Sequence, residues 1–591
     1  MEKANEVEKY LKKIMIVILS MVTATAFSIN MDIDAKITEI IKGNSIFIMA
    51  IFIIAYLALN KTSEIKNNRG KIICVTLAII FSSFEIIGNT INTYYDLTGI
   101  MTNGLTILKA IIRWIGNGVL FYELLINIFL KFDNTKIISK NFKWFKNNKR
   151  SFIITFLIIF LAWLPYFLNY YPGELTTDSM LQVYQSLFKI QLTNHHPLLH
   201  TLLIAIPLNI GQALGSYTVG VALFSILQML TLALIFSFAI YYMSKKNVDI
   251  RIRIGTLIFY AFYPVNGLYS ITMWKDIPFA MSMTLFTITM TEIATNKEQF
   301  FKFKRNIILL IINMILVMLL RNNGLYVIIL TIPFMFLFAR KYYKKLIVVT
   351  LIVIASYGIW KGPVFSLLNV KEGSSREALS IPLQQFARIM KYNPDSLSEQ
   401  EKKDIYKYLP VDNLAEEYIP YISDSVKIHF DDEAFKQDKS TLVKLYFTLA
   451  IEHPALTLEA FLCNSYGYWY PETRYWIATK EGTLEAKDFG IYQDPIIHLS
   501  ILEKFDSIID NPDIPVISML FSIGFICWIA LIMLAYAIYR KNYDYILIYI
   551  PLIILWLTTL ASPVFAEYRY VYAIFTCLPI LIGINFKNNK I

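Results

Sequence analysis

The sequence predicts an all-α polytopic membrane protein of about fourteen transmembrane helices. Juxtamembrane helices are expected at its outer face, and a mainly helical extracytoplasmic domain is inserted before the last three spans. Three observations predict this class. Apolar residues make up 56% of the 591 residues, charged residues only 17%, and the mean hydropathy is +0.50. Apolar runs long enough to cross roughly 30 Å of hydrocarbon recur along the chain. The basic residues collect in the connections between alternate runs.

Fourteen runs are predicted to span, because each offers close to the roughly 20 apolar residues that a transmembrane helix needs. They lie at 14–30, 44–59, 71–91, 104–131, 151–170, 217–243, 254–271, 276–295, 306–320, 324–339, 345–362, 514–539, 545–561 and 569–586.

The basic connections set the orientation. Segments such as "EKYLKK", "SKKNVDIRIR" and "RKYYKK" belong in the cytoplasm by the positive-inside rule. With these segments inside, successive connections alternate between the two sides of the membrane along the whole chain, provided that the apolar run 197–214 does not cross the membrane. That run is short and broken by Pro197, Pro207, Gly211 and Gly215, so we expect its helices to lie at the outer face. The prediction is a multi-pass protein of the cell membrane with both termini cytoplasmic.

Four domains are expected: an N-terminal four-helix extension (1–150), a transmembrane core (151–362) with an outer loop (171–214), the extracytoplasmic domain (363–512) and three C-terminal helices (513–591). Segment 363–512 carries 15 Lys and Arg against 24 Asp and Glu, a net charge of −9 that leaves +20 for the rest of the chain. The overall charge of +11 therefore reflects the basic residues of the cytoplasmic connections. No nucleic-acid partner is expected.

Several activities lack their motifs. The sequence has no GxxxxGK[ST], GxGxxG or GxSxG motif, so nothing indicates a nucleotide-dependent enzyme or a serine hydrolase. Its four cysteines give no zinc-type or disulfide framework.

Unusual polar residues gather on the predicted outer side. They occur in "YPGELTTDS", "NHHPLLH", "YPVNGLYSITMWKDIPF", "LLRNNGLY", "REALSIPLQQFARI" and "SPVFAEYRYVY". Charged groups near a bilayer centre cost about 2.5–3.5 kcal/mol on insertion scales. Their convergence on one interface predicts a site for an anionic, partly embedded ligand.

The same segments carry a family resemblance. "YPGELTTDS" followed by "HHPLLH" resembles the first outer loop of the GT-C integral-membrane glycosyltransferases, in which a loop Asp follows the first core helix. With "WKD", "RNNG", "PLQQ.AR" and "EYRY", the chain is similar to an uncharacterised bacterial branch of that superfamily. It is distantly similar to protein O-mannosyltransferases and lipid A aminoarabinose transferases. The resemblance covers roughly 150–591.

The resemblance implies transfer of a sugar from a polyprenyl-phosphate or polyprenyl-diphosphate carrier to an acceptor glycan, lipid or protein of the cell envelope. The active site would face outward, and membrane lipid would be a further partner. An attacking acceptor needs a base, and the lipid phosphate that leaves needs cations. Asp178 is the expected general base. The expected phosphate-binding residues are Lys275, Arg321, Arg376, Arg388 and Arg569, and the expected sugar or acceptor contacts are His195, His196, Asn322, Gln384, Gln385 and Glu567.

Simpler interpretations stand beside these roles. Asp178 lies where a helix-capping residue would, and Asp276 could cap its helix while Lys275 reaches the headgroups. His196 and His200 are four residues apart, as zinc ligands can be, but the Glu of HExxH is absent and the histidines are interpreted as structural or substrate-orienting. The family often has two adjacent acids where this chain has Asp178–Ser179, and Glu174 is a substitute, so a divalent metal is left open.

Glu567 and Arg569 are two residues apart and would not share a helix face, so their partners are expected elsewhere. Two other functions also remain. A transporter or flippase for a lipid-linked or anionic solute would place polar residues near the bilayer midplane. An envelope glycan polymerase or ligase would share the substrate class but would depend less on Asp178.

Overall fold

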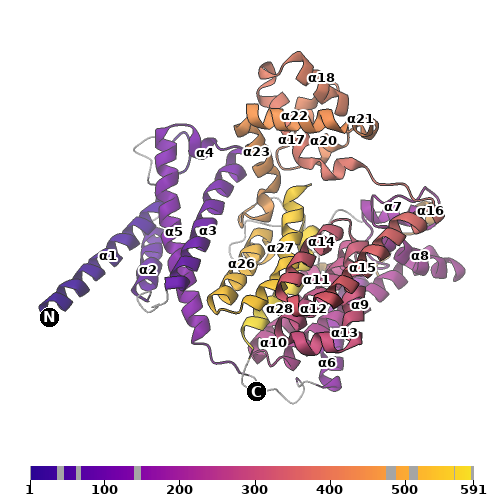
Figure 1. Cartoon of the computed structure of the whole chain (residues 1–591), viewed down its shortest axis with the longest axis horizontal. Coiled ribbons are helices and arrows are strands. Elements are labelled where there is room, and N and C mark those ends of the chain that lie inside the picture. Colours follow the sequence, from indigo (N-terminus) through magenta and orange to yellow (C-terminus); the bar gives the residue numbers. More distant parts are fainter. Residues whose placement is uncertain are drawn as a thin grey trace. The chain divides into compact units, whose positions relative to one another are not determined.

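The chain is almost entirely helical (Figure 1). The computed structural model describes every residue except 1, 36–40, 42–44, 62–67, 139–144, 146–147, 474–486, 503, 505–516, 565 and 588–591. Within these described ranges β-structure is limited to isolated bridges, for example between Glu174 and Thr272. The all-α class is therefore confirmed for the described part of the chain.

Nine helices among the described residues are long and apolar enough to cross a membrane. They are α1 (Glu2–Ser28), α3 (Asn68–Tyr94), α5 (Gly104–Asp133), α6 (Lys149–Asn169), α9 (Tyr217–Lys245), α12 (Asp276–Lys302), the run Arg340–Leu367, the run Tyr543–Ala561 that contains α27 (Ile546–Ala561), and α28 (Tyr568–Asn585). Shorter apolar helices are α2 (Ser45–Lys61), α8 (Leu198–Ala213), α14 (Gly324–Phe338) and α26 (Ile523–Tyr539). These helices support a membrane protein, but the predicted count of fourteen spans is not confirmed.

One predicted span is divided. Residues 254–271 were expected to form a single helix, but they belong to α10 (Ile250–Phe262) and α11 (Pro264–Ile271). Pro264 lacks the N–H that would continue α10 and instead occupies the first turn of α11, where proline is tolerated. The segment therefore turns before reaching Lys275.

The chain folds into two compact units. Unit 1 comprises residues 1–136, 380–475 and 522–541. Besides α1–α3, α5 and α26, it contains α4 (Thr98–Met101), α17 (Ser380–Tyr392), α18 (Glu399–Tyr408), α19 (Leu414–Glu417), α20 (Asp424–Lys427), α21 (Asp432–Gln437), α22 (Lys439–Glu452) and α23 (Pro454–Ser465). In its core, Trp528 of α26 stacks on Phe81 of α3 with ring centroids 4.2 Å apart.

Unit 2 comprises residues 137–379, 476–521 and 542–591 and holds the Asp178 loop. Besides α6, α8–α12, α14, α27 and α28, it contains α7 (Thr177–Ser186), α13 (Lys304–Leu320), α15 (Tyr343–Ile359), α16 (Phe365–Leu367) and α25 (Ile517–Phe521). Short helical turns are η3 (Arg340–Tyr342), η4 (Trp360–Val364), η5 (Ser375–Ala378), η8 (Lys487–Phe489) and η9 (Tyr543–Tyr545). Helices α12 and α28 pack together and are largely buried.

The units divide the chain differently from the four sequence segments. Most of 1–150 lies in unit 1, but the segment 363–512 is shared between both units. Short helices fill most of its described residues, as expected. The predicted boundary between 512 and 513 lies outside the described residues.

Candidate functional site

The loop that carries Asp178 is tied to the connection between α11 and α12. The Glu174 N–H donates to Ile271 O at 3.1 Å, and the Met273 N–H donates to Glu174 O at 3.0 Å. The Ser179 hydroxyl donates to Met273 O at 2.8 Å. These bonds place residues 174–179 beside residues 271–275, and so bring Asp178 next to Lys275.

Gly173 makes this close approach sterically allowed. Its φ of +141° belongs to the region that favours glycine, and a Cβ there would meet Ser225 Oγ at 2.0 Å and Ile271 O at 3.1 Å. The glycine in "YPGELTTDS" therefore has a structural reason to be there.

Asp178 does not cap its helix. The N-cap of α7 is Thr176, which forms a capping box with Ser179, and Asp178 lies in the first turn. The Trp274 indole N–H donates to Thr176 Oγ1 at 2.7 Å and holds the cap in place. The capping interpretation of Asp178 is therefore wrong, and its carboxylate is used elsewhere.

The Asp178 carboxylate is held by two cations through one oxygen. Lys275 Nζ lies 2.8 Å and Arg569 Nη1 2.7 Å from Oδ2. His196 Nδ1 lies 3.9 Å from the same atom. Among the described residues no hydrogen bond or ion pair reaches Oδ1, and the side chain is 24% exposed. One oxygen is therefore anchored, and the other is available to a ligand.

The charge state of Asp178 follows from these neighbours. Burial alone would raise its pKa, but the charges of Lys275 and Arg569 outweigh burial and hold the pKa well below its usual range. The carboxylate is therefore ionised at any physiological pH. Its ion pairs stabilise the folded chain above the unfolded pKa of about 4, and this contribution is lost as pH falls through the folded value.

Arg569 connects Asp178 to Glu567. The guanidinium donates through Nε and Nη2 to the two Glu567 oxygens, the Nη2–Oε1 distance being 3.2 Å. Glu567 has extended backbone (φ −107°, ψ 133°) just before α28, so helix spacing does not govern the pair. The expectation that these two residues find separate partners is wrong for this reason. The Arg569 guanidinium also lies over the Trp274 ring, 5.0 Å from its centroid.

A second ion pair lies close by in sequence. Arg321 Nη1 is 3.2 Å from Asp276 Oδ1 and donates to Tyr570 O at 2.8 Å. Asp276 is buried at the start of α12 and makes no capping hydrogen bond there. Lys275, Arg321 and Arg569 thus face three carboxylates, those of Asp178, Asp276 and Glu567. We call these six residues the charged cluster; its formal charges balance.

His196 lies against the charged cluster as a neutral ring. Its Nδ1 lies 3.2 Å from Lys275 Nζ; because an ammonium group can only donate, Nδ1 accepts and the ring proton belongs on Nε2. Burial, with the nearby Lys275 charge, lowers the pKa of His196 to about 2. His200 Nδ1 instead lies 2.9 Å from Gln182 Oε1.

This histidine predicts an acid sensitivity. Below about pH 6.5 the unfolded chain binds a proton at His196 that the folded chain does not, so stability falls as pH falls. We expect His196→Gln to flatten the decline of Tm between about pH 6.5 and 4.5, as measured by thermal unfolding in detergent. His429→Gln, at a partly exposed histidine, is the control. A His196→Gln curve parallel to that of the native chain would contradict the assignment.

The remaining expected residues of unit 2 lie around the loop 194–196. Asn322 Nδ2 donates to the carbonyls of Asn194 and His195, at 3.2 and 3.3 Å. Burial, partly offset by Glu377, lowers the pKa of His195. Arg376 is 32% exposed and pairs with Glu377 at 3.3 Å.

Three expected residues belong to unit 1 instead. Arg388 is buried and donates to Glu459 Oε2 at 2.6 Å and to Tyr418 Oη at 2.9 Å. Gln384 donates to Ile419 O at 3.1 Å, and Gln385 donates to Thr457 O at 3.0 Å. These bonds account for three buried polar side chains within unit 1, and the structure does not place them in the charged cluster.

Metal ligation finds no support in the described part of the chain, which contains no group of three or more His, Cys, Asp or Glu side chains able to hold an ion. Glu174 is buried and accepts from Gln493 Nε2 at 3.1 Å. Sequence reasoning missed Asp276 as an ion-pair partner, and Trp274 and Tyr570 as the rings beside Arg569 and Arg321. All three lie inside the quoted motifs "WKD" and "EYRY", and their place in these motifs is the sequence feature that could have indicated them.

Comparison with known proteins gives a family without an assigned activity. Residues 188–590, about two thirds of the chain, match the family described as "Family of unknown function (DUF6020)". The chain belongs to the DUF6020 family. The DUF6020 match includes His196, Lys275, Arg321 and Arg569, and it begins after Asp178. No curated protein and no solved structure matches the chain.

Proposed function

We propose that this chain is a membrane glycosyltransferase that moves a sugar from a polyprenyl-phosphate-linked donor to an acceptor of the cell envelope. The observation that carries the proposal is the Asp178 carboxylate, anchored at Oδ2 by two cations and unpartnered at Oδ1 within the described residues. A base that must take a proton from a positioned acceptor needs this combination of fixed geometry and one accessible oxygen.

The proposed step is a single displacement at the anomeric carbon. The acceptor hydroxyl or amine gives its proton to Asp178 Oδ1 while its oxygen or nitrogen bonds to the anomeric carbon. The bond from that carbon to the phosphate oxygen breaks, and the lipid phosphate leaves with the electron pair. A carboxylate of low pKa suffices because the acceptor proton becomes acidic as the new bond forms. Inversion of configuration is carried over from the GT-C resemblance.

The cations are assigned different roles by their partners and their exposure. Arg569 is 7% exposed and uses four of its five N–H groups, two on Glu567, one on Asp178 and one on the Tyr570 hydroxyl, so we assign it to positioning Asp178. Lys275 donates to Asp178 and His196, which leaves one of its three N–H groups for a phosphate oxygen. Arg376 is the more exposed cation and is our second phosphate ligand.

Glycan profiling tests the proposal. Cells that produce the chain and cells that lack it are compared by mass spectrometry of envelope glycans and of lipid-linked sugars. We expect the cells without the chain to lose one glycan or sugar substituent and to accumulate its lipid-linked precursor. Identical profiles in both fractions would contradict a transferase, and a precursor confined to the inner leaflet would favour the flippase alternative.

A further inference from the structure

A second segment of unit 2 packs against the Asp178 loop. Residues 487–502, which we call the strap, begin with η8. Ile491 of the strap is 1% exposed and belongs to the same apolar cluster as Leu175 and Val183, which lie on either side of Asp178 in the sequence. Apolar burial of this kind fixes the strap to the loop.

Hydrogen bonds join the same two segments. The Tyr184 hydroxyl of α7 donates to Asp488 Oδ2 at 2.6 Å. Gln493 Nε2 donates to Glu174 Oε1 at 3.1 Å. One side of the strap is therefore held by the loop that carries Asp178.

The later part of the strap is bonded to the end of α6. The Ile496 N–H donates to Leu168 O at 2.9 Å, and the Leu499 N–H donates to Asn169 Oδ1 at 2.6 Å. Because α6 ends at Asn169, these bonds place residues 496–499 beside the last turn of the helix.

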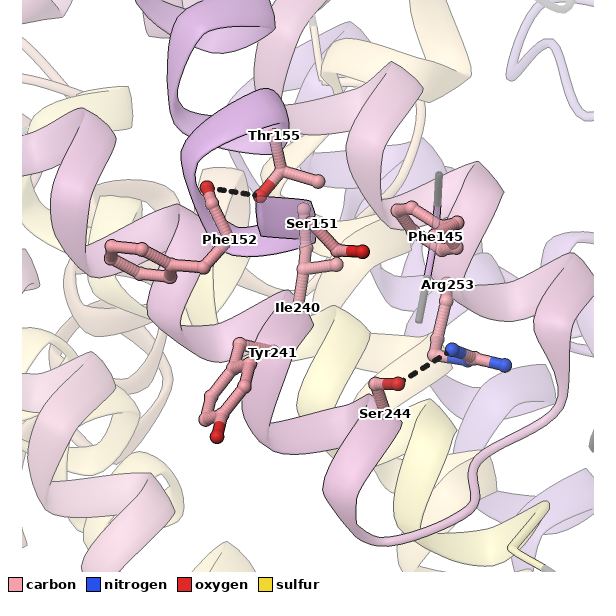
Figure 2. A pocket seen from close by; sticks show the side chains of 8 residues that line it. All are labelled: Phe145, Ser151, Phe152, Thr155, Ile240, Tyr241, Ser244 and Arg253. Carbon is pink, nitrogen blue, oxygen red and sulfur yellow. Dashed lines mark hydrogen bonds between the residues drawn. The ribbon is translucent and has the colours of Figure 1, made fainter. Parts of the chain in front are cut away.

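Helix α6 has one packed face and one exposed face. Near its start, Ser151 and Thr155 line a small pocket together with Ile240 of α9 and Arg253 of α10, so this face packs against protein (Figure 2). Another face exposes large apolar side chains at every fourth residue. They are Ile153, Leu157 and Leu161. On a helix long and apolar enough to span a membrane, such a stripe faces lipid.

The end of α6 gives the depth of the strap. A helix of 21 residues is about 30 Å long, roughly the thickness of the hydrocarbon core, so Asn169 lies near the boundary of one leaflet. Leu168 follows Leu161 by seven residues, or two turns, and continues the exposed stripe. Since Leu168 O accepts from Ile496, the strap meets this boundary beside the lipid-facing stripe.

The strap is apolar and exposed where it meets the boundary. Residues 495–502 contain no Asp, Glu, Lys or Arg. Ile496 is 57% exposed, Ile497 45% and Ile501 58%. Tyr492, just before them, is also exposed, and tyrosine is enriched at membrane–water interfaces. Apolar side chains at this depth are covered by lipid, as they are on interfacial segments of other membrane-associated proteins.

We propose that the strap is an interfacial membrane anchor. The side chains of Ile496, Ile497 and Ile501 insert into the lipid of the leaflet at the Asn169 end of α6, while the other side of the strap holds the Asp178 loop. Bilayer lipid is the partner of this apolar surface. The anchoring is independent of sugar transfer.

Spin labels on the full chain test the proposal in nanodiscs of phosphatidylcholine and phosphatidylglycerol. Ile496→Cys and Ile501→Cys are labelled singly with a nitroxide. The four native cysteines are buried, and the native chain treated with the same label measures their background. Leu161→Cys on α6 is the lipid reference, and Ile428→Cys, at an exposed isoleucine that follows α20, is the water reference. Power saturation reports collisions with oxygen, which is enriched in lipid, and with a nickel chelate, which stays in water.

We expect both strap labels to collide with oxygen about as often as the label at Leu161→Cys. Their collisions with the nickel chelate should be several-fold fewer than at Ile428→Cys. Nickel collisions as frequent as at Ile428→Cys would place the strap in water and overturn the proposal. Protection from both reagents would mean that protein, such as a second copy of the chain, covers the isoleucines, and this result would also overturn it.

A second measurement uses a third position and does not depend on the first two variants folding. Bimane attached to Ile497→Cys is read in nanodiscs that contain lipid with a nitroxide at the top of its acyl chain. We expect this lipid to quench the bimane as strongly as it quenches a bimane at Leu161→Cys. Fluorescence unchanged by the nitroxide lipid would contradict insertion of the strap.

Discussion

Replacing Asp178 by asparagine is expected to lower sugar transfer by about 100- to 10,000-fold, the range that a general base contributes. The amide keeps the shape of the side chain but takes no proton at Oδ1. The measurement is the envelope glycan profile and the lipid-linked precursor pool, with variant and native chains at equal abundance in the membrane. The precursor should accumulate as it does when the chain is absent.

The control for Asp178→Asn is Asp488→Asn. Asp488 is an exposed carboxylate that accepts from the Tyr184 hydroxyl of α7 at 2.6 Å, so the change disturbs the same helix without touching the charged cluster. We expect a native profile from it. A native profile from folded, abundant Asp178→Asn protein would mean that the carboxylate serves only as a counter-ion to Lys275 and Arg569.

Replacing Arg569 by glutamine is expected to destabilise the folded chain by about 3–5 kcal/mol, the cost of breaking a buried ion pair by removing one partner. The arginine is 7% exposed, and its loss leaves the Glu567 carboxylate without its cation. Thermal unfolding in detergent measures the effect as a fall in Tm. A large fall in Tm supports a positioning role for Arg569, whereas the sequence alone indicated a phosphate-binding role.

Two further variants make the Arg569 result interpretable. Arg376 is about one-third exposed and pairs with Glu377, so Arg376→Gln should change the free energy of unfolding by about 1 kcal/mol or less. The double variant Glu567→Gln with Arg569→Gln should be less destabilised than the sum of the two single variants, because it leaves no unpaired Glu567 charge. A stable Arg569→Gln protein with weakened donor binding would restore the phosphate-ligand assignment.

The sequence anticipated much of the charged cluster. Asp178, Lys275, Arg321, Arg569 and Glu567 were selected because charged groups near a membrane are costly and these gather on one predicted side. The structure brings all five together, with His196 against them. Among the described residues, helices also occupy most of the predicted spans, with 254–271 divided between α10 and α11, because apolar run length is a strong local signal.

Other features depended on information that local patterns do not carry. Arg388 shares a motif-rich segment with Arg376, yet its partner Glu459 lies in unit 1. Nothing local distinguishes an arginine that faces a ligand from one that forms an ion pair inside its own unit. The Glu567–Arg569 pair was missed because helix geometry was assumed at a residue that precedes the helix.

The pairing of Asp178 with Arg569 has a consequence for biosynthesis. The two residues are separated by 391 positions, and Lys275 arrives 97 positions after Asp178. At typical elongation rates of about 5–20 residues per second, Asp178 waits about 20–80 s for the guanidinium that completes its anchorage. The charged cluster is thus completed only when α28 has been synthesised, and until then a nascent chain carries the Asp178 carboxylate without the Arg569 guanidinium that anchors it.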